Sequence, residues 1–413
     1  MLCIAKKTAR LSVYFDSRTR GSNRSGFFQK LANTKSPFRG LAQIIAVLIS
    51  LVSGCDETKK PDATFSVAGA LGGVAAEGFK TADKVISFQF PEDHGTHPEY
   101  RNEWWYFTGN LANEQGQRYG YQLTFFRIGL LPPSKHIQQD SHWSHRDIWM
   151  AHAALTDDSN NRHYHDEKFS RGNPGMAGAR IEPFKVWLDN WQFEALGDPF
   201  PWHIDVETNE FSLQFDLTAS KPMVLQGNHG LSQKSPNPGN ASYYYSYPRL
   251  QTTGNIQVGD EHYLVTGLSW FDREWSTSAL DEDQIGWDWF SLQLDDGNDL
   301  MYYQLRNRQG QPHASSQGKW ISANGNTNTI KPEDIDLQVQ RYWQDNNGIN
   351  YPVEWRLHYK IQNRPWIVRA LVDEQLMKTS VTYWEGAVEV IDGDGKLLLG
   401  RGYLEMTGYY GTS

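Results

Sequence analysis

Cysteine is nearly absent from this sequence: only Cys3 and Cys55 occur among 413 residues. A disulfide scaffold needs several cysteine pairs, so that class of small stapled protein is excluded. Basic residues are also in deficit, with 39 lysines and arginines against 48 acidic residues and a formal net charge of −9. A nucleic-acid surface needs a positive field, and DNA or RNA is therefore not an expected partner.

The sequence also lacks an apolar run that can span a bilayer near its start. Residues 41–54 form an uncharged run of 14, whereas a spanning helix needs about 20 residues. A basic flank, a short apolar run and small residues before Cys55 are typical of a signal peptide, and Val52-Ser53-Gly54-Cys55 resembles the lipobox of bacterial lipoproteins. We expect a signal peptide over residues 1–54 and a lipid on Cys55; an ordinary cleaved signal or a buried thiol is the alternative.

Removal of residues 1–54 would leave an acidic chain, because nine basic residues and one acidic residue lie there and the remainder carries a net charge of −17. Anionic headgroups repel such a chain, so acyl chains rather than a basic surface should attach it to the membrane. The expected location is the bacterial cell envelope, facing the periplasm or the cell surface. Residues 55–84 are small, polar and rich in Gly and Ala, which predicts a tether.

Aromatic residues are abundant, with 16 Trp, 20 Tyr and 19 Phe, and 36 Gly and 18 Pro supply turns. From residue 85 onward, short aromatic and β-branched runs alternate with turn residues, as at 104–111, 119–128 and 263–270. This pattern predicts antiparallel hairpins in a sandwich or a barrel. Residues 146–155 are ambiguous between helix and strand.

An internal repeat indicates the architecture. Residues 104–127 resemble residues 287–306, an offset of 183; chance similarity between aromatic hairpins is the alternative. The repeat predicts an all-β fold of two tandem antiparallel β-barrels, one over residues 85–278 and the other over residues 279–413.

Strand alternation assigns the repeated aromatic residues to faces, because residues two apart share a side. Trp104 and Tyr106 lie on one face of the first copy, and Trp287 and Trp289 lie on the matching face of the second. Each of these faces mixes large aromatics with hydrogen-bonding groups, which suits the inside of a ligand cup. We expect these four residues to bind a ligand; a half-exposed outer surface is the alternative.

The segment 267–275 is the densest in chemistry-bearing residues. As a strand, it places Trp270, Asp272 and Glu274 on one face, with the two acidic residues about 6.5 to 7 Å apart at their Cα atoms. Two carboxyls beside an indole can take different pKa values, as acid/base chemistry requires. Asp272 and Glu274 are therefore candidate catalytic residues and Trp270 a candidate ligand contact. An ion-pair cluster of these acids with Arg273 at a barrel rim is the alternative.

Four tyrosines fall within five positions, and three of them, Tyr243, Tyr245 and Tyr247, share a strand face. Phenols at a cavity wall can orient a ligand or donate a proton, although plain packing is the alternative.

Other site chemistries lack their sequence patterns. Histidines at 94/97, 142/145 and 163/165 are spaced as metal ligands, but no Cys pair or His-Glu-x-x-His run accompanies them, so no metal is expected. Ser269 lacks the second glycine of a nucleophile elbow. No glycine-rich phosphate loop follows a strand, and no cofactor is expected.

Six motifs taken together resemble the lipocalin-like family that contains carotenoid 1,2-hydratase (hydroxyneurosporene synthase) and proteins labelled predicted secreted hydrolases. The resemblance extends over about residues 88 to 410. The motifs are Glu103-Trp104-Trp105-Tyr106, Gly120-Tyr121-Gln122-Leu123-Thr124-Phe125-Phe126-Arg127, Ala151-His152-Ala153-Ala154-Leu155-Thr156-Asp157, residues 241–250, Trp270-Phe271-Asp272-Arg273-Glu274-Trp275 and residues 402–409.

The resemblance implies two lipocalin-like antiparallel β-barrels. It also implies that Asp272 is the acid catalyst for the addition of water to a terminal C=C bond. Tyr243 and Tyr245 stand where the hydratases are thought to place a His and an aromatic partner, and this sequence has no His there. The hydrolase label finds no nucleophilic triad to support it.

The expected function is that of an envelope lipoprotein whose tandem barrels bind an apolar ligand such as a polyene, a terpenoid or a lipid. Hydration of a C=C bond is the reaction its residues support. A noncatalytic carrier or chaperone for a hydrophobic ligand is the alternative. The identity of the ligand and the oligomeric state are left open.

Overall fold

The computed structural model describes residues 77–135, 146–171, 175–278, 280–362 and 364–409. Cys55, the expected signal peptide and most of the expected tether lie outside these residues. Three short 3-10 helices occur in the described part, at Glu92–His94 (η1), Pro332–Asp334 (η2) and Lys360–Gln362 (η3). No helix found there has both the length and the apolar character needed to cross a bilayer.

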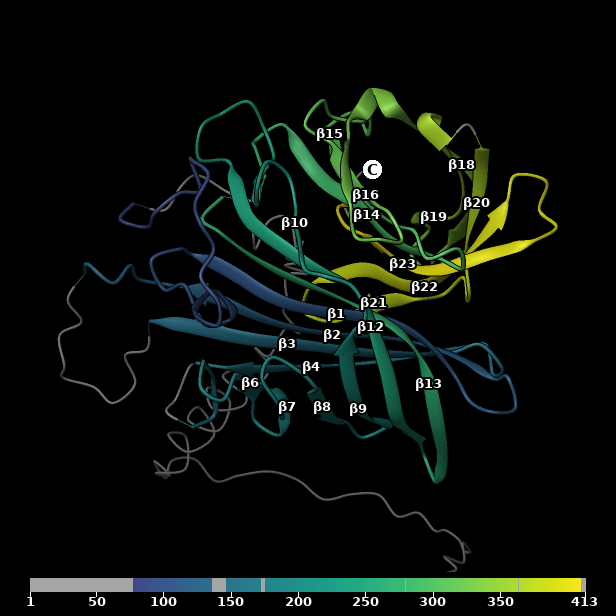
Figure 1. Cartoon of the computed structure of the whole chain (residues 1–413), viewed down its shortest axis with the longest axis horizontal. Helices are drawn as coiled ribbons and strands as arrows, with labels where there is room; N and C mark the ends of the chain where they lie inside the picture. Colours follow the sequence, from purple (N-terminus) through teal and green to yellow (C-terminus); the bar gives the residue numbers. More distant parts are fainter. Residues whose placement is uncertain (1–76, 136–145, 172–174, 279, 363, 410–413) are drawn as a thin grey trace, which may run out of the picture. The chain divides into compact units, whose positions relative to one another are not determined.

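The remaining regular structure is β-strand, arranged in two curled antiparallel sheets (Figure 1). One sheet forms a nearly closed barrel and the other a half-barrel, which confirms the all-β prediction of two tandem lipocalin-like barrels. The strands of the first sheet end at Ser276 and those of the second begin at Gln284. The expected domain boundaries at residues 85 and 279 stay predictions.

The first sheet has thirteen strands. In spatial order they are β4 (Arg162–Ser170), β3 (Asp147–Asp157), β2 (Arg118–Gly129), β1 (Asn102–Ala112), β13 (Glu261–Ser276), β12 (Ala241–Val258), β9 (Phe211–Ala219), β8 (Trp202–Glu207), β7 (Trp191–Ala195), β6 (Lys185–Leu188) and β5 (Ala177–Arg180), with β10 (Val224–Leu225) and β11 (Leu231–Gln233) paired to β12. The ambiguous segment 146–155 therefore belongs to a strand, β3.

The second sheet has ten strands. In spatial order they are β17 (Thr327–Ile330), β16 (Gln317–Ile321), β15 (Asp299–Asn307), β14 (Gln284–Leu294), β23 (Leu398–Met406), β22 (Thr382–Asp392), β20 (Arg364–Ala370), β19 (Asn350–Tyr359) and β18 (Ile335–Gln344), with β21 (Leu376–Lys378) paired to β22.

The two repeated hairpins hold matching places in their sheets. The first, β1 with β2, lies beside β13, which is the last strand of its sheet in chain order; the second, β14 with β15, lies beside β23, which is likewise the last. The repeat seen in the sequence is thus a repeat of strand pairing.

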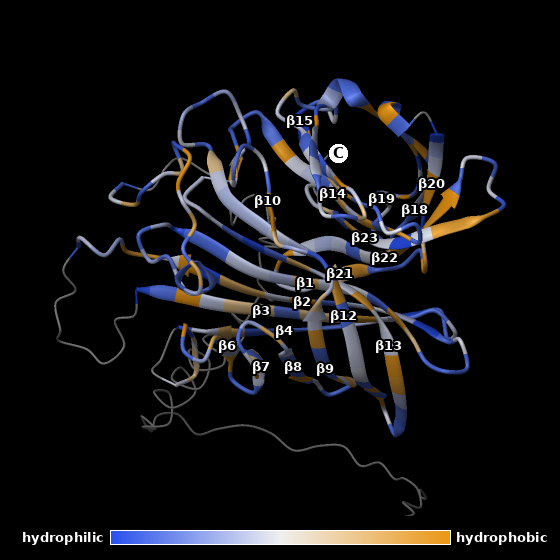
Figure 2. Ribbon diagram, viewed as in Figure 1, coloured by the Kyte–Doolittle hydropathy of each residue, from blue (hydrophilic) through white to orange (hydrophobic). Residues whose placement is uncertain are grey.

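Alternation along these hairpins separates two kinds of face. Trp105 and Phe107 of β1 lie in the core enclosed by the first sheet, and Phe290 and Leu292 of β14 lie in the core enclosed by the second. Figure 2 shows apolar and polar residues interspersed along the strands of both sheets. Burial of aromatic surface on the inner faces is the main force that closes each sheet, at roughly 25 cal/mol per Å² of apolar area.

The interior of each barrel is filled with side chains, so the expectation that the mixed aromatic faces line a cup inside the barrels is wrong. Trp104 and Tyr106 point out of the first sheet, Trp287 and Trp289 point out of the second, and all four belong to clusters between the sheets. The rings of Tyr106 and Trp289 meet edge to face at 5.3 Å between centroids. The two mixed faces cover each other.

Small residues meet at one contact between the two sheets. Strands β1 and β2 of the first sheet lie against β23 and β22 of the second (Figure 1). A Cβ atom added at Gly120 would stand 2.4 Å from the Cβ of Ala387, so this approach requires glycine at position 120. The buried carboxylate of Asp299 on β15 accepts charged hydrogen bonds from Lys221, in the connection between β9 and β10, and from Arg249 on β12, and these bonds tie the two sheets together.

Candidate functional site

A pocket lies where the two mixed faces meet, and its empty space, together with the part that is open to solvent, is about 680 Å³. Its walls combine aromatic rings with four carboxyl groups and one lysine. The lining residues are Trp104, Tyr106, Thr124, Phe126, Lys234, Tyr244, Asp272, Glu274, Leu280, Trp287, Trp289, Tyr303, Leu305, Tyr383, Glu385 and Glu405. A mostly apolar cavity with a few converging polar groups is the usual form of a small-molecule site.

Asp272 accepts three hydrogen bonds from protein side chains. One of its oxygens accepts a hydrogen bond of 2.6 Å from the Tyr244 hydroxyl, and the other accepts bonds from the Trp270 indole and the Ser246 hydroxyl. Burial raises the pKa of Asp272 to about 7, although these three donors oppose the rise. No ion pair is made by Asp272 within the described residues, so its proton can be exchanged near neutral pH.

Glu274, two residues further along β13, has the opposite character. Its carboxylate lies 3.1 Å from the ammonium group of Lys234 and accepts a bond from the Ser242 hydroxyl. Burial lowers the pKa of Lys234, but the interactions with Glu274 and Tyr303 together exceed that effect and leave the pKa raised. The lysine also stands 4.1 Å above the ring of Tyr303. The ion pair of Lys234 and Glu274 forms part of the pocket wall.

Two further carboxyls come from the second sheet. Glu385 on β22 and Glu405 on β23 are directly opposed across their strand pair. Burial raises the pKa of Glu405 to about 8, and burial together with the neighbouring Glu405 raises the pKa of Glu385 well above its usual range. The hydroxyl of Tyr106 donates a 2.8 Å hydrogen bond to Glu385 across the sheets. The second sheet therefore presents carboxyls that stay protonated at neutral pH.

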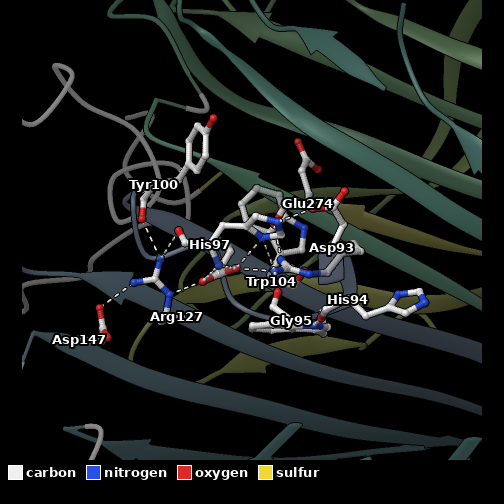
Figure 3. Close-up of polar contacts among 12 residues, drawn as sticks. Asp93, His94, Gly95, His97, Tyr100, Trp104, Arg127, Asp147 and Glu274 are labelled. Carbon is white, nitrogen blue, oxygen red and sulfur yellow. Dashed lines mark hydrogen bonds and ion pairs between the residues drawn. The ribbon is translucent and has the colours of Figure 1, made fainter. Parts of the chain in front are cut away.

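Arg273 points away from the pocket and completes a separate buried ion cluster. Its guanidinium pairs with Glu103, stacks 3.9 Å over the ring of Trp105 and is fully buried. Glu103 also pairs with Arg127, which in turn lies 2.6 Å from Asp147 (Figure 3). Burial would raise the pKa of Glu103, but the two arginines hold it far below its usual range. The arginine of the 267–275 segment is thus structural, and it does not pair with the two acids beside it.

The structure corrects the positions of the predicted tyrosines. Tyr243 and Tyr245 lie in the core of the first barrel, where their hydroxyls contact the Lys84 carbonyl and the His94 ring. Tyr244, of the opposite parity, faces the pocket. Residues directly opposed in an antiparallel pair point to the same side, and Asp272 on β13 is opposed to Ser246 on β12.

The other predicted site residues fall mostly around the pocket. Asp272, Glu274, Trp104, Tyr106, Trp287 and Trp289 line it. Trp270 does not line it but donates a 2.6 Å hydrogen bond to Asp272. Among the described residues, no group of three or more His, Cys, Asp or Glu side chains is arranged to hold a metal ion.

The sequence did not point to the other lining residues, and five of these carry ionisable groups that matter for the site: Lys234, Tyr244, Tyr383, Glu385 and Glu405. A usable signal existed for Glu405. The repeat aligns Tyr106 with Trp289, and these two residues are opposed to Asp272 and Glu405 respectively, so Glu405 is the counterpart of Asp272. Lys234 follows a three-residue strand and has no comparable signal.

The fold and the site together define a lipocalin-like β-barrel protein with an acidic, aromatic pocket between two curled sheets. The chain belongs to the AttH-like family, whose profile matches residues 81–409. Among curated protein sequences, none matches.

The solved structures that are similar to this chain include the following two. A protein assigned as AttH from Nitrosomonas europaea shares 37% sequence identity, with a TM-score of 0.70 over 78% of this chain and 97% of that one. Kievitone hydratase from Nectria haematococca shares 13% identity, with a TM-score of 0.59 over 82% of this chain and 98% of that one. At 13% identity, the similarity to kievitone hydratase shows the fold alone.

Proposed function

We propose that this protein adds water to a C=C bond of an apolar polyene or terpenoid held in the pocket between its sheets. The observation that carries the proposal is Asp272, a buried carboxyl that is free of ion pairs within the described residues and whose pKa is raised to about 7 beside aromatic walls. A carboxylic acid that is partly protonated at neutral pH is the group that alkene protonation requires.

The steps balance as follows. Asp272 gives its proton to one alkene carbon, and the π electrons form the new C–H bond while the other carbon becomes a cation. The faces of Trp104 and Trp289 stabilise the cation. Water forms a C–O bond to the cation and releases one proton. Asp272 then takes up one proton, so the protein returns to its starting charge and the net reaction is addition of water. A trisubstituted C=C bond suits this chemistry because its protonation forms a tertiary cation.

Two resemblances support hydration over other acid-catalysed reactions. The sequence motifs resemble a family that contains carotenoid 1,2-hydratase, and one of the fold neighbours is named kievitone hydratase. The Tyr244 hydroxyl, rather than that of Tyr243 or Tyr245, donates a hydrogen bond to Asp272, and we assign the orientation of water beside Asp272 to this phenol.

The test uses geraniol and geranylgeraniol, two acyclic isoprenoid alcohols with trisubstituted C=C bonds, in H₂¹⁸O. Wild-type protein should form a product 20 Da heavier than the substrate, and Asp272→Asn should lower its rate at least about 100-fold, the scale of a lost general acid. Asp216→Asn, on an exposed position of β9, serves as the control and should keep full activity.

A noncatalytic carrier is the second candidate, favoured by the aromatic lining of the pocket. If wild-type protein forms no ¹⁸O-labelled product from either alcohol, yet retains an apolar molecule in native mass spectrometry, the result would favour the carrier function over hydration. Equal rates for wild type and Asp272→Asn would remove Asp272 from the proposed role.

We further propose that Cys55 carries the lipid that anchors the protein in the bacterial envelope. Cys55→Ser should then move the protein from the membrane fraction to the soluble envelope fraction. An unmodified thiol at residue 55 in mature wild-type protein would contradict lipidation while leaving the proposed reaction untouched.

A further inference from the structure

Tyr383 begins a chain of polar side chains that leads away from the pocket wall. This tyrosine lies on β22 of the second sheet and lines the pocket. Its hydroxyl is 2.7 Å from Nδ1 of His152, a fully buried histidine on β3 of the first sheet. The imidazole packs against Phe126, another pocket residue, at 5.5 Å between ring centroids.

The chain continues from His152 toward solvent. Nε2 of His152 has no hydrogen-bond partner among the described residues and lies 3.7 Å from a carboxylate oxygen of Glu167 on β4. The side chain of Glu167 is 28% exposed and accepts a 2.9 Å bond from the backbone N–H of Ser380. The three side chains thus connect the pocket wall to a partly exposed carboxylate.

The charges around His152 favour its neutral form. Burial lowers the pKa of His152, while Glu167 opposes that effect; Tyr383 faces it from β22, and His165 and Glu167 face it from β4. Burial also raises the pKa of Tyr383 well above its usual range. A neutral phenol therefore donates to Nδ1, and the imidazole proton on Nε2 faces Glu167.

We propose that Tyr383, His152 and Glu167 form the path by which the proton released from water leaves the pocket during hydration. This inference rests on the function proposed above. As water adds to the cation, its proton passes to the Tyr383 oxygen, the phenolic proton passes to Nδ1 of His152, and the proton on Nε2 passes to Glu167 and then to solvent. Tyr383 stays neutral throughout, and Asp272 takes up a new proton from solvent. The relay leaves the imidazole proton on Nδ1, so His152 returns to the Nε2 tautomer before the next turnover.

The first barrel holds a matched pair that lacks this connection. His94 Nδ1 lies 2.6 Å from the Tyr245 hydroxyl, and burial lowers the pKa of His94 to about 4. Tyr245 points into the barrel core rather than into the pocket. The pair His94–Tyr245 therefore reproduces the chemistry of His152–Tyr383 without access to the proposed reaction.

The test compares two rates with geraniol in D₂O: hydration, and the appearance of deuterium in unreacted geraniol. Deuterium enters when Asp272 protonates the alkene and the cation returns to alkene, which needs no second base. His152→Gln and Tyr383→Phe should lower hydration about 10-fold or more while deuterium exchange persists, so the ratio of exchange to hydration rises. His94→Gln should leave this ratio unchanged.

The outcomes separate the two proposals. A wild-type protein that neither hydrates nor exchanges would overturn the proposed function, and the proton path with it. Wild-type hydration with an unchanged ratio in His152→Gln, or with equal loss of both rates, would overturn the proton path alone. If these variants fail to bind the uncharged dye N-phenyl-1-naphthylamine, ¹⁵N NMR of wild-type protein decides instead. His152 should then be neutral with its proton on Nε2, and a cationic ring or a proton on Nδ1 would contradict the path.

Discussion

Asp272 and Glu405 occupy the same place in two different sheets. Each lies in the strand that comes last in the chain order of its sheet, β13 or β23. Asp272 is directly opposed to Tyr106, and Glu405 is directly opposed to Trp289, which is the equivalent residue of the repeated hairpin. Both line the pocket between the sheets, where Asp272 is buried and Glu405 is half-buried. Position alone would give them the same role.

Their neighbours make them different. Asp272 receives three hydrogen bonds from Tyr244, Ser246 and Trp270. Glu405 has the Trp287 indole as its donor and another carboxyl, Glu385, directly opposite. Burial raises the pKa of both groups, and nearby acids add to the rise: Glu274 for Asp272, and Glu274 with Asp272 for Glu405. Donors favour the ionised carboxylate, and three donors at Asp272 against one at Glu405 leave their pKa values at about 7 and about 8. The repeat sets the location, and the neighbours set the chemistry.

The largest expected effect is the difference in hydration rate between variants of the two carboxyls. In the ¹⁸O assay, Glu405→Gln keeps the hydrogen-bonding shape of a protonated acid and should lower hydration no more than about 10-fold, against at least about 100-fold for Asp272→Asn. A larger loss for Glu405→Gln than for Asp272→Asn would reverse the assignment and make the second sheet the source of the proton.

The pH dependence of hydration should follow the carboxyl of the first sheet. The active form of Asp272 is protonated, so the rate should be constant below pH 7 and fall about tenfold per pH unit above it, because its pKa is about 7. A rate–pH profile of kcat measures this directly. A fall centred near pH 8, the pKa of Glu405, would indicate that Glu405 supplies the proton.

The contact between the two sheets can be tested at Gly120 and Ala387. Gly120→Ala places a methyl group 2.4 Å from the Cβ of Ala387, and overpacking of this kind costs about 1 to 3 kcal/mol. Thermal unfolding should show the loss, and the paired substitution Gly120→Ala with Ala387→Gly should recover most of it. No recovery in the double variant would mean that the cost does not arise at this contact.

The smallest expected effect on activity concerns the tyrosine strand. Tyr245→Phe removes a hydroxyl that bonds His94 in the barrel core, so stability should fall by about 1 kcal/mol and hydration should stay within about twofold of wild type. Tyr244→Phe removes a donor from Asp272 and should change the rate and the pH profile. A greater loss of activity for Tyr245→Phe would restore the role that the family resemblance implies for it.

Much of this arrangement follows from local pattern. Turn residues between aromatic runs predicted the hairpins, and alternation correctly grouped Trp270 with Asp272 and Glu274, and Tyr243 with Tyr245. The similarity of residues 104–127 to residues 287–306 predicted two sheets built alike. These features depend on residues close together along one strand or hairpin, and the two-residue period of a strand makes them readable.

The sequence by itself thus determined the strands, their faces and the repeat, and it drew attention to Asp272. Only the tertiary structure decided which face is inside, which strands are neighbours and what stands beside each acid. Those choices depend on pairing between distant segments: the register of β12 against β13 brought Tyr244 rather than Tyr243 to the pocket, and the packing of one sheet on the other brought Tyr106 to Glu385. A strand pattern is unchanged when its inner and outer faces are exchanged, and only the aromatic packing inside each barrel removes that ambiguity.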